Sequence, residues 1–74
     1  MRVISQEALQ SLRERFPQGT RVELVKMDDV QAPPVGTKGT VLCVDDIGTI
    51  HVAWDCGGSL GVAYGEDICR KISN

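Results

Sequence analysis

The sequence has few of the residues from which metal sites and catalytic sites are usually built. It contains one histidine, His51, and three cysteines separated from one another by twelve residues each: Cys43, Cys56 and Cys69. Zinc sites usually use closely spaced cysteine pairs, and an odd number of thiols cannot fill an internal disulfide framework. We therefore expect reduced, mostly buried thiols, with no bound metal and no cofactor.

The acidic residues also lack a catalytic or calcium-binding spacing. Glu66 and Asp67 are adjacent, so their side chains should point apart rather than across a substrate. The other aspartates do not follow the spacing of a calcium loop. A catalytic thiol–imidazole pair would need the side chain of Cys43 to lie beside that of His51. We instead expect His51 to face solvent on its strand. These absences favour a protein that is not an enzyme.

Long apolar runs are missing as well. No stretch is long enough for a membrane span, and no apolar segment follows Arg2 as it would in a signal peptide. We therefore expect a cytoplasmic protein. At 74 residues the chain allows one domain, residues 1–74, with a small core. Because the core is small, any site should be a shallow groove on the surface or a pocket between copies. We regard a homo-oligomer as possible, since association of copies would ease the shortage of core.

An excess of positive charge is missing from most of the chain. Residues 1–21 hold four arginines against two glutamates, a net charge of +2. Residues 22–67 hold two lysines against eight acidic residues, a net charge of −6, and Arg70 and Lys71 add +2. Nucleic-acid binding needs a basic track that displaces counterions. We therefore consider nucleic acid an unlikely partner, which only the basic ends of the chain could contact.

The first part of the chain has the pattern of an amphipathic helix over residues 5–16. Ser5 is a good N-cap, and Ile4 and Leu9 have the spacing of a hydrophobic staple. Pro17 should end the helix at Phe16. An apolar stripe would lie on one side of the helix, formed by Ala8, Leu9, Leu12 and Phe16. This helix should cap an open end of the remaining domain or pack against a second copy.

From residue 20 onward the apolar residues alternate with polar ones, which predicts strands. In the third of these, Ile50, Val52 and Trp54 share a face, so Trp54 should point into the core. An ordered loop of about ten residues, 27–36, follows the first strand, since it contains two prolines and a glycine. Short strands with regular turns predict a barrel over residues 20–72. The five predicted strands are 20–26, 37–44, 49–55, 60–64 and 69–72.

Several motifs resemble a family of short bacterial and phage-encoded proteins of unknown function. They cover nearly the whole chain: GTRVELVKMDD at 19–29, QAPP at 31–34, GTKGTV at 36–41, VDDIG at 44–48, WD at 54–55 and YGED at 64–67. The resemblance implies an SH3-like barrel, often encoded on phages and other mobile elements. The fold class we expect is therefore mainly β: a small SH3-like five-strand barrel with an N-terminal α-helix. The resemblance implies no activity.

The leading functional hypothesis is a non-catalytic binding module that engages a protein partner. The groove would lie between the 27–36 loop and the turn at 45–48, with Tyr64 or Trp54 on its floor. Its acidic rim would favour a basic or proline-containing surface. The residues expected to bind are Asp28, Asp29, Gln31, Pro33, Pro34, Asp46, Trp54, Asp55 and Tyr64.

A second hypothesis is an oligomeric protein that sequesters a small signalling nucleotide and so counters a host defence. In that case Arg13, Arg15 and Arg21 would contact phosphates and an aromatic side chain would contact the base. A third hypothesis is nucleic-acid binding through the basic ends.

Overall fold

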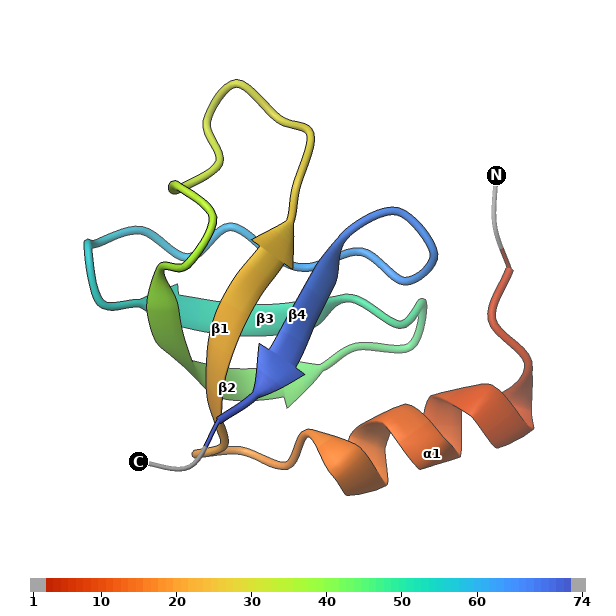
Figure 1. Cartoon of the computed structure of the whole chain (residues 1–74). Helices are drawn as coiled ribbons and strands as arrows, with labels where there is room; N and C mark the ends of the chain where they lie inside the picture. The colour runs from red at the N-terminus through yellow and green to blue at the C-terminus, as the bar shows by residue number, and fades with distance from the viewer. Residues whose placement is uncertain (1–2, 73–74) are drawn as a thin grey trace.

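The computed structural model describes residues 3–72 as one helix and four strands (Figure 1). The helix α1 spans Gln6–Arg15, within the predicted 5–16. The Ser5 side chain accepts a hydrogen bond from the Ala8 N–H at 3.1 Å, and the Phe16 N–H donates to the Leu12 carbonyl. The predicted cap and the predicted end of the helix are thus confirmed. Among residues 3–72 there is no helix with the length and apolar character that a membrane span requires.

The four strands form one antiparallel sheet in the order β3-β2-β1-β4. Their bounds are β1 Arg21–Lys26, β2 Lys38–Val44, β3 Ile50–Trp54 and β4 Ile68–Lys71. β2 pairs with β1 from Lys38 to Thr40 and with β3 from Gly39 to Val44, so one strand serves both neighbours. The register between β2 and β3 shifts between Val41 and Cys43, a bulge of the kind that increases strand twist.

The described sheet is open, whereas the sequence predicts a closed five-strand barrel. The strand predicted at 60–64 is reduced to one bridge, in which Ile50 and Val62 exchange two backbone hydrogen bonds of 2.9 and 2.8 Å. Directly after the bridge, the backbone of Ala63 takes part in a local turn. Its N–H donates to the Asp67 carboxylate at 3.0 Å, and its carbonyl accepts from the N–H groups of Glu66 and Asp67. The predicted last strand is present as β4.

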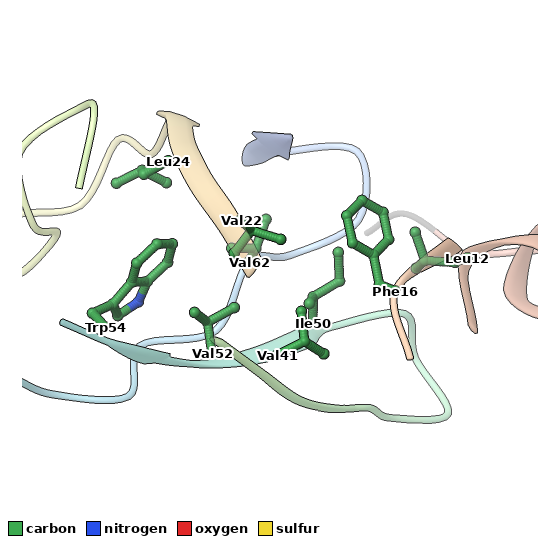
Figure 2. Close-up of a cluster of buried hydrophobic side chains, with 9 residues drawn as sticks. All are labelled: Leu12, Phe16, Val22, Leu24, Val41, Ile50, Val52, Trp54 and Val62. Carbon is green, nitrogen blue, oxygen red and sulfur yellow. The ribbon is translucent and has the colours of Figure 1, made fainter. Parts of the chain in front are cut away.

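The buried core lies inside the curve of the sheet, beside the end of α1 (Figure 2). Val22, Leu24, Val41 and Val52 are completely buried. Trp54 is 4% exposed, and its Nε1–H donates to the Leu60 carbonyl at 2.8 Å, so its predicted orientation into the core is confirmed. The full cluster is Leu12, Phe16, Val22, Leu24, Val41, Ile50, Val52, Trp54 and Val62.

Gly39 allows β2 to lie against this core, and substitution there gives a test of the packing. A Cβ at Gly39 would lie 2.6 Å from Val52 Cγ1 and 2.8 Å from the Ala53 carbonyl oxygen. We expect Gly39→Ala to lower the free energy of unfolding by about 1–3 kcal/mol, as overpacking does. Urea denaturation measures this change. Cys43→Ser is exposed on the same strand and should change it by less than about 0.5 kcal/mol; equal midpoints for both variants would contradict the packing argument.

Candidate functional site

The loop between β1 and β2 is held in one shape by its own hydrogen bonds. At its base, the Gly36 N–H donates to the Leu24 carbonyl at 2.8 Å, and the Leu24 N–H donates to the Thr37 carbonyl at 2.9 Å. Within it, an Asp29 carboxylate oxygen accepts from the Gln31 N–H at 2.8 Å, a local bond typical of aspartate in turns. The loop expected at Met27–Gly36 is therefore held in shape by hydrogen bonds within the loop as well as by its attachment to the sheet.

A groove of about 340 Å³ runs between this loop and the turn that follows β3. Gln31 and Pro33 line it from the loop, and residues 56–60 form the facing wall. Trp54 lies at its floor, but the indole is almost entirely buried and offers no face on which a ligand could stack. We refer to this feature as the loop groove. Sequence reasoning identified its loop side and missed its other wall.

The groove that the sequence predicted, between the loop and the Asp45–Gly48 turn, is not formed. The loop leads into the start of β2 and the turn follows the end of β2, so they lie at opposite ends of that strand. Tyr64, which is 42% exposed, lines a separate pocket beside α1 and Gly48. Of the residues expected to bind, the structure brings Gln31, Pro33 and Trp54 together and leaves Asp46 and Tyr64 elsewhere.

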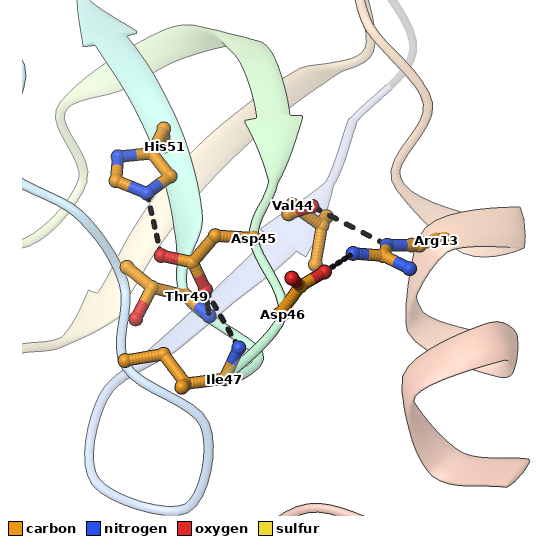
Figure 3. A network of polar contacts seen from close by, with 7 residues as sticks. All are labelled: Arg13, Val44, Asp45, Asp46, Ile47, Thr49 and His51. Atoms are coloured by element: carbon orange, nitrogen blue, oxygen red, sulfur yellow. Dashed lines mark hydrogen bonds and ion pairs between the residues drawn. The ribbon is translucent and has the colours of Figure 1, made fainter. Parts of the chain in front are cut away.

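Asp46 and its neighbour Asp45 fix the turn after β2 to the rest of the protein (Figure 3). Asp46 forms an ion pair with Arg13 of α1 at 2.7 Å, and Arg13 also donates to the Val44 carbonyl at 3.3 Å. An Asp45 oxygen lies 2.8 Å from Nε2 of His51. Partial burial acts to raise the pKa of Asp45, but hydrogen bonds from His51 and from two backbone N–H groups lower it overall. This network has a structural role.

Asp55 is likewise engaged within the protein. Its two carboxylate oxygens accept from the Arg21 guanidinium at 2.9 and 2.6 Å, and the same guanidinium donates to the Thr40 hydroxyl at 3.0 Å. The Arg21 guanidinium thus links β1 to Thr40 of β2 and to Asp55, the residue that follows β3. The hydrogen bond from Arg21 holds the pKa of Asp55 below its ordinary value of 3.8.

The three arginines proposed for phosphate binding do not converge on one site. Arg13 and Arg21 are paired with Asp46 and Asp55. Arg15 lies over the Phe16 ring, with its guanidinium carbon 5.3 Å from the ring centroid.

Cys43 and His51 are cross-strand partners in the β2–β3 pairing, and the hydrogen bond that the imidazole forms is to Asp45 rather than to the thiol. Nε2 of His51 is used by Asp45. Nδ1 points to the far side of β3, where a Cβ at Gly61 would lie 3.8 Å from it. The expectation of mostly buried thiols is wrong for Cys43 and Cys56, which are exposed. Burial does raise the pKa of the Cys69 thiol, to about 11. Residues 3–72 contain no group of three or more potential ligand side chains placed to hold a metal ion.

Comparison with known proteins identifies a family. A model of a domain of unknown function (DUF4314) matches residues 5–72, so the chain belongs to this family. The match agrees with the expected membership in a family of unknown function. Neither the search of curated proteins nor the search of solved structures found a match.

The Arg21–Asp55 pair predicts how stability depends on pH. Because folding lowers the pKa of Asp55, its contribution to stability is present above pH 3.8 and is lost as the pH falls below that value. Asp55→Asn should therefore make the urea midpoint less sensitive to acid than in the wild type. Asp28→Asn removes a carboxylate that forms no ion pair within residues 3–72, and is the control. Identical acid profiles for wild type and Asp55→Asn would contradict the role of the pair.

Proposed function

We propose that this member of the DUF4314 family is a non-catalytic binding module that holds a short segment of a partner protein in the loop groove. The observation that carries the proposal is a pre-shaped groove, one wall of which is a loop that also carries the exposed Asp28 and Asp29. Loops held by a rigid sheet are common positions for binding residues. The proposed setting is the cytoplasm, with the gene on a phage or another mobile element, as the sequence resemblance implies.

The proposed architecture is SH3-like, and three features of the sheet support it. The strands β1, β2 and β3 form an antiparallel meander with a long loop after β1, and β4 pairs with the other edge of β1. β2 is shared between two neighbours and contains a bulge. The Ile50–Val62 bridge marks where a further strand would add to β3. A barrel of this kind would have its loops at its two ends, and the loop groove lies between two such loops.

The charges beside the groove favour a basic partner segment. Asp28 and Asp29 are exposed, and neither forms an ion pair in the part of the chain that the structure describes. Their fixed charge would attract a cationic segment and repel the phosphates of nucleic acid. Pro33 stiffens the loop wall, so less conformational entropy is lost when a partner binds.

The nucleotide-sequestering hypothesis has less support. It needs free arginines at one site, and the guanidinium groups of Arg13 and Arg21 are already paired with carboxylates. A phosphate would have to displace those carboxylates.

The role of Asp28 and Asp29 is tested with peptides in which net charge and proline content vary independently. Asp28→Asn/Asp29→Asn should bind a basic peptide about five- to tenfold more weakly, because each exposed ion pair contributes up to about 1 kcal/mol. Asparagine can still accept the Gln31 N–H bond, so the loop should keep its shape. Fluorescence polarisation gives the Kd values. Asp46→Asn removes a carboxylate at the other end of β2 and should bind like the wild type; a preference for acidic peptides would contradict the proposal.

The two exposed cysteines test the position of the groove. Cys56 lines the loop groove, and Cys43 lies on β2 outside it. A saturating concentration of the preferred peptide should slow the alkylation of Cys56 by iodoacetamide several-fold and leave Cys43 unchanged. Mass spectrometry of each cysteine-containing peptide follows both reactions. Protection of neither thiol, or of Cys43 alone, would place the binding surface elsewhere.

A further inference from the structure

A second apolar depression lies at the end of α1, and the function proposed above does not use it. Its floor is formed by Leu12, Phe16, Ile50 and Val62 of the core, and Tyr64 and Ile68 form exposed walls. We call this depression the helix-end pocket. Its volume is about 230 Å³. This is less than the roughly 300–1,000 Å³ of small-molecule sites, so an apolar side chain of a protein is a better fit than a nucleotide.

The loop between β1 and β2 supplies such a side chain at its tip. Val30 is fully exposed and stands between Asp29 and Gln31, whose hydrogen bond shapes the turn. The Ala32 N–H also donates to the Asp29 carbonyl at 3.0 Å, which closes the turn around Val30. The loop tip, defined as Asp28, Asp29 and Val30, is therefore a rigid projection with an apolar side chain beside two carboxylates. Burial of that side chain would be favourable.

The charges of the loop tip and of the helix-end pocket are complementary. Arg15 stands at the rim of the pocket above the Phe16 ring, and forms no ion pair within the described range 3–72. Asp28 and Asp29 carry the opposite charge. Asp67 also lies at the rim, where its carboxylate accepts a hydrogen bond from the Ala63 N–H. Arg15 on one surface and the two aspartates on the other are therefore complementary in charge.

One copy cannot bring these two surfaces together. Figure 1 shows the loop above the sheet and α1 below it, at opposite ends of the protein. We propose that the loop tip of one copy docks into the helix-end pocket of a second copy of this chain, with Val30 in the pocket and Asp28 and Asp29 beside Arg15. Such a contact is head-to-tail, so it propagates until the copies close a ring or form an open chain. The proposal does not rest on the function proposed for the loop groove.

The test uses two variants that each damage one surface, and measures assembly by sedimentation velocity. Wild type should form oligomers as its concentration rises to about 1 mM, the range of an interface with one anchoring side chain. Val30→Asp damages the loop tip and Arg15→Glu damages the pocket, so each variant alone should associate at least about tenfold more weakly. An equimolar mixture retains one intact tip and one intact pocket. It should therefore form a heterodimer that grows no further.

Val35→Asp is the matched control, because Val35 is an exposed valine of the same loop outside the tip. It should assemble like the wild type, and circular dichroism should show every variant folded. A wild type that stays monomeric up to about 1 mM would overturn the proposal. So would assembly that Val30→Asp leaves unchanged, or a mixture of the two damaged variants that stays monomeric.

Discussion

The close contact of β2 with β3 at Gly39 is the constraint on which the rest of the structure depends. Glycine there lets the β2 backbone lie against Val52 and the indole of Trp54. From that point β2 can pair with β1 on one side and β3 on the other, so the sheet curves around its own apolar face. The end of α1 covers one end of this core with Leu12 and Phe16. Both the loop groove and the helix-end pocket border the same packed strands.

Local chemistry made much of this fold predictable from the sequence. Ser5 and Pro17 allowed both ends of the helix to be predicted, because each residue acts on the backbone groups nearest to it. Alternation in residues 50–54 placed Trp54 in the core, since side chains on a strand point to opposite faces in turn. The same rule failed at 60–64, where only the Ile50–Val62 bridge forms and a local turn follows at Ala63. Alternation indicates which face a side chain takes, and it does not reveal whether the segment finds a strand to pair with.

The candidate site was predictable only on one side. Prolines and aspartates in residues 28–34 marked an ordered loop, and the loop is there. Which segment lies opposite to it depends on how the strands are arranged, and the facing wall comes from the turn after β3. Charge by itself was misleading for Asp46, Asp55, Arg13 and Arg21, because in the sequence a paired charge and a free one look the same.

The buried core draws nothing from the two segments that enclose the loop groove. Within residues 3–72, none of the buried apolar side chains belongs to residues 28–36 or 56–60. The groove is attached to the core mainly at Trp54, through its hydrogen bond to Leu60. Apart from the positive-φ glycines Gly36, Gly57 and Gly58, substitutions in the two enclosing segments could therefore accumulate during evolution at little cost in stability. A lineage could exchange one binding specificity for another while it keeps the same scaffold.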